Sequence, residues 1–270
     1  MKAWFALLAH SARRSRMFLL VTAALLAAFQ ILLAFAAKEL LELNTFSGLA
    51  ALVPDFMRQV FGTSLLTLMS FRGMACLGFF HIAIVAFLVG LIISMATELA
   101  GEVETRFLDV VLAHPLARHW IITRTIALLV GCVVLLLGAM MLGTWAGLHW
   151  LVASDLARES FAVVPQLALN LGILLLSWGG LALMLAAIAR RRNIAAATAS
   201  LLAMASYMID LISQAWKPLK PVARYSLFHY YNSLNLITGS RQVTHDVLIL
   251  ACVAAIAFAL SYLFFQYRDL

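Results

Sequence analysis

Residues 98–119 read ELAGEVETRFLDVVLAHPLARH, and this charged stretch separates two long apolar runs. It contains four carboxylates, two arginines and two histidines. The runs on either side, about residues 76–97 and 121–147, are long enough to cross roughly 30 Å of hydrocarbon as helices, which takes about 20 residues each. The stretch therefore predicts a polar connection between two membrane-spanning helices.

The spacing within this stretch predicts a short amphipathic helix over residues 98–113. At about 100° per residue, its apolar side chains share one arc beside a narrow polar stripe. Glu104 does not fit, because it falls on the apolar side. Pro115 ends such a helix. Two readings stay open: the helix anchors the loop at the membrane surface, or it passes an applied force to the spans on both sides. The polar stripe consists of Glu98, Glu102, Thr105, Arg106 and Asp109.

The composition of the whole chain is that of an integral membrane protein. Of its 270 residues, 64% are hydrophobic and 11% are charged, whereas soluble domains carry roughly 25% charged residues. Six apolar stretches reach spanning length, which excludes the shorter, alternating strands of a membrane barrel. We expect one all-α membrane domain over residues 1–270, with spans at about 17–37, 76–97, 121–147, 164–189, 194–216 and 246–266.

Basic residues predict the orientation of these spans. Cytoplasmic loops accumulate Lys and Arg, and three arginines lie together at 190–192, between the fourth and fifth spans. We therefore expect both termini and the 98–119 connection in the cytoplasm. The first apolar run exceeds the roughly 7–15 residues of a signal-peptide core, so we expect it to remain uncleaved. The net charge of +7 fits this bias. The sequence has no basic face with interleaved aromatic residues, so we expect no nucleic-acid partner.

Two of the outer connections are long enough to hold helical segments of their own. From Pro54, the run PDFMRQVFGTSLLTLM suits a helix lying on the outer membrane surface, because Pro54 fits a first turn and Asp55 fits the positive helix end. In residues 217–245, early prolines block a continuous helix. The later aromatic residues suit the membrane interface, and they are Tyr225, Phe228, Tyr230 and Tyr231.

Motifs for nucleotide binding and catalysis are missing from the sequence. It has no G-x-x-x-x-G-K-[ST], no H-E-x-x-H and no G-x-S-x-G. No two of the seven histidines are four residues apart, and the three cysteines have no metal-site spacing. We expect a chain that is not an enzyme and has no catalytic residue, metal or cofactor of its own.

A few residues within the spans are candidates for contact with a transported molecule. A charged aspartate at mid-membrane costs about 2.5–3.5 kcal/mol, and Asp210 lies only about six residues from the outer end of its span. It therefore contacts a substrate or proton, or it pairs with another helix, or its side chain reaches the outer interface. Met204 and Tyr207 share one helical face that either packs or lines a pathway, and Phe80 and Phe87 of the second span leave the same alternatives.

Taken as a motif, AGEVETRFLDVVLAHPLAR (100–118) resembles a stretch of ABC-2 type transporter permeases, which follows the second of six spans on the cytoplasmic side. LVPDFMRQVFG (52–62) is similar to the family's Leu-Pro…Phe-Gly stretch, and YSLFHYYNSLNLITG (225–239) is similar to the segment before its last span. Together these segments extend the resemblance over most of the chain. The family's Gly-Thr stands here as Arg106-Phe107, and we expect the loss of glycine to let the helix run on.

The resemblance implies a permease subunit of an exporter in the plasma (bacterial inner) membrane. Two copies of this chain, or this chain and a related one, surround the pathway between second and fifth spans, within membrane lipid. Each copy binds a separate P-loop ATPase that holds ATP and Mg. The coupling residues are then Glu98, Glu102, Glu104, Arg106, Asp109, Pro115 and Arg118, and candidates for the pathway lining are Phe80, Phe87, Met204, Tyr207 and Asp210.

The sequence leaves two alternative functions and the substrate open. One is a proton- or ion-coupled carrier that uses Asp210, although such carriers usually contain several buried ionisable residues. The other is an integral membrane enzyme or scaffold, although no convergent set of nucleophile, base or metal ligands supports an enzyme. An apolar pathway with a few aromatic residues suits lipids, drugs or other amphipathic molecules.

Overall fold

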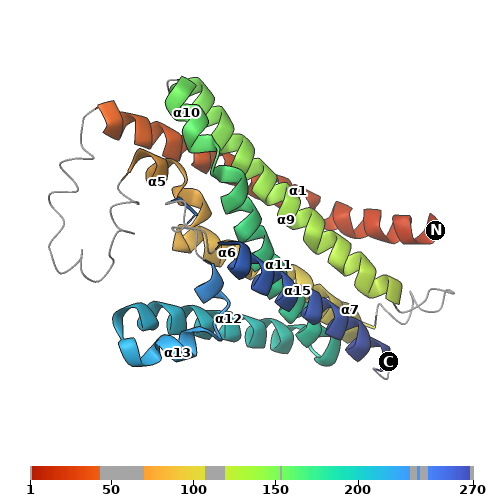
Figure 1. Cartoon of the computed structure of the whole chain (residues 1–270). Coiled ribbons are helices and arrows are strands. Elements are labelled where there is room, and N and C mark those ends of the chain that lie inside the picture. The colour runs from red at the N-terminus through yellow and green to blue at the C-terminus, as the bar shows by residue number, and fades with distance from the viewer. Residues whose placement is uncertain are drawn as a thin grey trace.

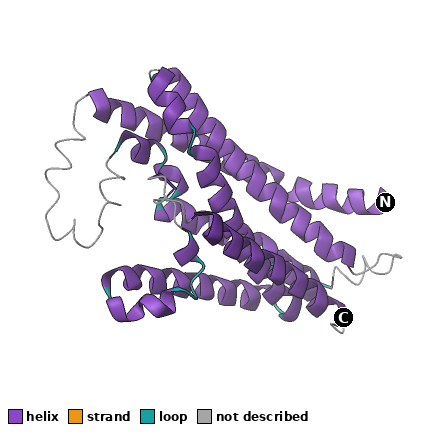
Figure 2. Ribbon diagram, viewed as in Figure 1, coloured by secondary structure: helices purple, strands orange, loops and turns teal. Residues whose placement is uncertain are grey.

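The computed structural model describes residues 2–42, 70–106, 119–152, 154–231, 236–237 and 243–267. Within these ranges every secondary-structure element is a helix (Figure 2), and six helices are long and apolar enough to cross a membrane. The prediction of an all-α chain with six spanning segments is confirmed. The helix predicted from Pro54 lies outside the described residues, as do Asp109, Pro115 and Arg118.

The long helices contain most of the predicted spans. Helical hydrogen bonding satisfies the backbone groups within each segment, which the hydrocarbon interior of a membrane requires. Helix α1 extends well beyond its apolar run, because hydropathy marks only the part of a helix that lies in lipid. The six are α1 (Lys2–Glu42), α6 (Ile82–Ala96), α9 (His119–Leu151), α11 (Val164–Ile188), α12 (Arg192–Ala215) and α15 (Val243–Gln266) (Figure 1).

The second span begins later than predicted, because α5 (Phe71–Ala75) and the 3-10 turn η1 (Leu77–Phe79) precede α6. Contacts from distant segments account for this turn. A Cβ at Gly78 would lie 2.5 Å from the Gln30 Oε1 of α1, and the Tyr231 hydroxyl donates a hydrogen bond to the Phe79 carbonyl. The prediction of one continuous helix over 76–97 is therefore wrong in its first turns.

Helix α11 forms the centre of the bundle and packs against α6, α9, α12 and α15. Within its spanning segment 67% of the residues are buried, against 17% for α12. Figure 1 shows α12 at one side of the bundle, and large apolar residues such as Leu201 and Met204 lie exposed on it. This surface needs lipid or another protein chain to cover it.

Helices α1 and α9 run side by side over much of their length (Figure 1). Glycines permit this approach, because a Cβ at Gly143 would lie 2.4 Å from the Ala27 carbonyl oxygen and one at Gly147 would lie 2.7 Å from the Ala34 Cβ. The two helices run in the same direction, so the beginning of α1 and the beginning of α9 lie at the same end of the bundle.

Short helical pieces connect the long helices at the other end. Helix α10 (Ser154–Phe161) joins α9 to α11. After α12 the chain forms the 3-10 turn η2 (Lys217–Leu219), the short helix α13 (Lys220–Ala223) and the 3-10 turn η3 (Phe228–Tyr230). The early prolines break this connection into pieces, as predicted.

Candidate functional site

The predicted coupling segment begins as a direct continuation of the second span. Helix α7 (Glu98–Glu104) follows α6 after the single residue Thr97, whose hydroxyl donates a hydrogen bond to the Ile93 carbonyl at 2.9 Å. Leu99 and Ala100 are buried in the core of the bundle. The carboxylates of α7 are therefore held in place at one end of the bundle, beside α9 and α12.

Glu102 forms an ion pair with Arg124, which lies within the second turn of α9. The Arg124 Nη2 donates to the Glu102 Oε2 at 2.5 Å, and the Arg124 side chain is only 6% exposed. A buried guanidinium needs a counter-charge, because its desolvation is costly. The Arg124 Nε has no hydrogen-bond partner among the described residues. Glu102 thus compensates most of this buried charge and links α7 to α9.

Arg192, the first residue of α12, lies across the junction of α6 and α7. Its Nη2 is 3.6 Å from the Glu98 Oε1 and donates to the carbonyl and hydroxyl oxygens of Ser94, both at 3.3 Å. Gly101 leaves room for this side chain, since a Cβ there would lie 3.1 Å from the Arg192 Cδ. Close packing against the Arg192 side chain therefore explains the glycine at position 101, next to Glu102.

Glu104 caps the start of α12. Its Oε2 accepts a hydrogen bond from the Arg192 backbone N–H at 3.0 Å. The first N–H groups of a helix lack partners within the helix, and a carboxylate also interacts favourably with the positive end of the helix dipole. The carboxylate that did not fit the predicted polar stripe thus binds the backbone of a neighbouring span.

Helix α7 ends at Glu104, so the prediction of one helix over residues 98–113 is wrong. Thr105 follows as the cap residue, and Arg106 has a φ of 55°. This left-handed conformation ends a right-handed helix and favours glycine. The resembled motif has glycine at this position. The expectation that arginine lets the helix run on is therefore wrong, because the backbone keeps the conformation that glycine favours.

The predicted pathway residues do not gather in one place. Phe87 on α6 is exposed and lines the cavity described below. Phe80 is partly buried against the core, and Met204 is exposed on α12. Tyr207 packs edge-to-face against Phe228, with ring centroids 5.5 Å apart. Of the five predicted pathway residues, Phe87 is the one that lines this cavity.

Asp210 pairs with the connection that follows its own helix. Its Oδ1 lies 3.5 Å from the His229 Nδ1, and its Oδ2 accepts a hydrogen bond from the Gln214 Nε2 at 3.2 Å. Its side chain is 17% exposed. Because His229 belongs to η3, Asp210 links α12 to the connection that follows it.

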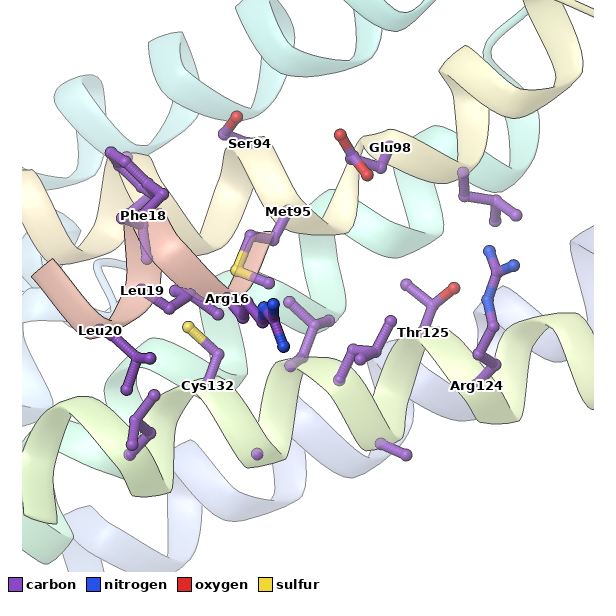
Figure 3. A pocket seen from close by; sticks show the side chains of 18 of the residues that line it. Arg16, Phe18, Leu19, Leu20, Ser94, Met95, Glu98, Arg124, Thr125 and Cys132 are labelled. Atoms are coloured by element: carbon purple, nitrogen blue, oxygen red, sulfur yellow. The ribbon is translucent and has the colours of Figure 1, made fainter. Parts of the chain in front are cut away.

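A cavity of about 900 Å³ opens between α1, α6 and α9 (Figure 3). Its lining is apolar along the helices and charged at the end where α7 begins. Both ion pairs of α7 border this charged end. The charged lining residues are Arg16, Glu98, Glu102, Arg124 and Arg192.

Sequence reasoning identified the carboxylates but missed their partners. Arg192 served only as one of the basic residues that predict the orientation of the spans, and Arg124 was not considered as a contact. One signal was available for Arg124, because an arginine inside an apolar run needs a nearby carboxylate. No comparable signal indicated that Glu104 binds the backbone of α12, since this contact joins residues 88 positions apart.

Comparisons of the chain with protein-family models, with curated proteins and with solved structures found no match.

Proposed function

We propose that this chain is the membrane-spanning subunit of an ABC-2 type transporter in the bacterial inner membrane. The resemblance of residues 100–118 to that family supports the proposal. The structural observation that carries it is the set of contacts made by α7. This helix continues α6 and is bonded to α9 through Glu102 and to α12 through Glu98 and Glu104.

These contacts give a route for mechanical coupling. A partner ATPase that binds residues 98–118 from the cytoplasm, with both termini of the chain on the same side, would press on α7. Because α7 is tied to three spans, a displacement of it changes the positions of α6, α9 and α12 together. ATP and Mg, held by two copies of the ATPase, supply the energy in this scheme, and this chain only transmits it.

Two permease copies form the pathway in this proposal. The uncovered apolar surface of α12, which carries Leu201 and Met204, supports a second chain beside it. The sparse polar residues of the spans suit an amphipathic substrate that is exported.

Site-specific photo-cross-linking tests the proposal. A photoreactive amino acid replaces Arg106, next to α7, or Tyr225, which is 90% exposed beyond the other end of α12. We expect cross-links from position 106 to a protein with a P-loop, identified by mass spectrometry, and none from position 225.

Two outcomes contradict the proposal. One is that a P-loop ATPase cross-links from position 225, or that no P-loop ATPase cross-links from either position. The other is transport by the purified chain in vesicles without any ATPase. If transport then depends on an ion gradient and is lost in Asp210→Asn, the carrier alternative replaces the permease.

A further inference from the structure

The cavity between α1, α6 and α9 has the two-part character of an amphiphile site. Its volume of about 900 Å³ falls near the upper end of the roughly 300–1,000 Å³ typical of ligand sites. Along the helices it is bordered by apolar residues such as Phe87, Leu128 and Leu135, and its polar groups gather where α7 begins. A ligand with an apolar body and one polar end matches this division.

The charged end has one positive charge in excess, because three arginines and two glutamates line it. Glu102 pairs with Arg124 and Glu98 pairs with Arg192. Arg16 forms no ion pair with a carboxylate in the described part of the chain. Figure 3 shows its guanidinium between α6 and α9. Its free donors select an anion.

Two glycines keep the apolar part of the cavity open. Gly90 on α6 and Gly131 on α9 line it, and a Cβ at either position would meet no atom within 4 Å. Close packing explains a glycine such as Gly143, where a Cβ would collide with α1. It does not explain Gly90 or Gly131, whose missing side chains leave room for a ligand instead.

The cavity also adjoins surface that faces lipid. Phe18 and Leu20 of α1 line it and are 59% and 54% exposed, and Phe87 of α6 is 46% exposed. Helix surfaces of this kind contact acyl chains in a membrane, so a lipid reaches the cavity sideways without passing through water. Basic pockets between spanning helices are known to bind acidic lipid headgroups.

We infer that this cavity binds an anionic phospholipid from the adjacent leaflet. Its phosphate accepts hydrogen bonds from the Arg16 guanidinium, and an acyl chain lies along Gly90, Gly131 and Leu135. The cavity borders the proposed ATPase contact, because Glu98 and Glu102 line it, but phospholipid binding needs no partner protein. Its test therefore uses the full chain alone, and its result is independent of the transport proposal.

The first experiment compares lipids that differ only in headgroup. The purified chain in detergent is titrated with phosphatidylglycerol or with phosphatidylcholine of the same acyl chains, and native mass spectrometry counts the bound lipid. We expect preferential retention of phosphatidylglycerol. Arg16→Gln weakens this binding roughly fivefold. Arg224→Gln makes the same charge change at an exposed position beyond the far end of α12 and leaves binding unchanged.

The second experiment fills the apolar part of the cavity. Leucine at Gly131 occupies the space of the acyl chain, so Gly131→Leu loses phosphatidylglycerol binding. Gly138→Leu is the matched control, because a Cβ at Gly138 also meets no atom within 4 Å but Gly138 does not line the cavity. Gly90→Leu repeats the test from the opposite wall if the Gly131 variant does not fold.

Three results overturn the inference. The first is that phosphatidylglycerol and phosphatidylcholine bind equally well. The second is that leucine at position 90 or 131 in a folded chain leaves lipid binding unchanged. The third is that glycerol 3-phosphate, which carries the phosphate without acyl chains, competes with phosphatidylglycerol at equal concentration. That result assigns Arg16 to a free anion rather than to a lipid.

Discussion

Glu102 and Arg124 form the shortest ion pair among the described residues, with 2.5 Å between Oε2 and Nη2. The pair joins the helix after the second span to the beginning of the third. Both side chains are largely withdrawn from solvent, at 18% and 6% exposure. Arg124 therefore depends on a single carboxylate from another segment for its counter-charge.

Removal of that carboxylate is expected to destabilise the protein strongly. Glu102→Leu leaves Arg124 buried and uncompensated, which costs about 3–5 kcal/mol. Replacing both residues by leucine recovers most of this loss, because two apolar side chains need no counter-charge. Unfolding in SDS measures the difference. Glu42→Gln, which removes an exposed pair with Lys38, serves as the control and changes stability by less than about 1 kcal/mol. Equal stability of the single and double leucine variants contradicts the prediction.

Glycine at position 106 is expected to stabilise the protein. Arg106 has a φ of 55°, and a Cβ in this conformation costs about 1–2 kcal/mol. Arg106→Gly removes that cost, whereas Arg106→Ala removes the charge but keeps the Cβ. We expect thermal unfolding to show a gain of about 1 kcal/mol for glycine only. A similar gain for alanine assigns the effect to the charge instead.

The cap from Glu104 on α12 predicts a local change in hydrogen exchange. Glu104→Ala leaves the Arg192 amide without its acceptor and costs about 1 kcal/mol, the usual effect of losing a helix cap. The amide protons in the first turn of α12 then exchange several-fold faster. Glu104→Gln keeps an acceptor oxygen and has a smaller effect. Unchanged exchange at Arg192 in the alanine variant rules out the cap.

The close contact between α1 and α9 predicts opposite effects at two glycines of one helix. In Gly143→Ala the new Cβ collides with the Ala27 carbonyl oxygen, so the helices must separate, at a cost of about 1–3 kcal/mol. Gly138→Ala meets no neighbour and gains up to about 1 kcal/mol from helix propensity. SDS unfolding compares the two variants. A neutral Gly143→Ala refutes the contact.

The orientation predicted from the basic residues gives the expected accessibility of introduced cysteines. In a chain with its three natural cysteines replaced, a cysteine at Arg191 is expected on the cytoplasmic side and one at Tyr225 on the outer side. A membrane-impermeant thiol reagent added to intact cells therefore labels position 225 and not 191. The reverse pattern inverts the topology and places α7 away from a cytoplasmic ATPase.

The sequence alone determined the class of fold and the number of spans. An apolar run of about 20 residues has few options in hydrocarbon, because its backbone groups must bond within the segment. The hydropathy pattern therefore located all six long helices. It failed at residues 76–81, where Gln30 and Tyr231 shape the turn, and beyond Glu104, where a left-handed residue ends α7.

Only the tertiary structure decided what the carboxylates of α7 do. From the sequence, Glu98, Glu102 and Glu104 were a polar stripe available to a partner. In the folded chain each one contacts an arginine of another span. Arg16 lines a cavity that no local sequence pattern indicated. The physical reason is that these contacts join residues 22 to 94 positions apart. Packing of the helices therefore sets them, and local periodicity does not.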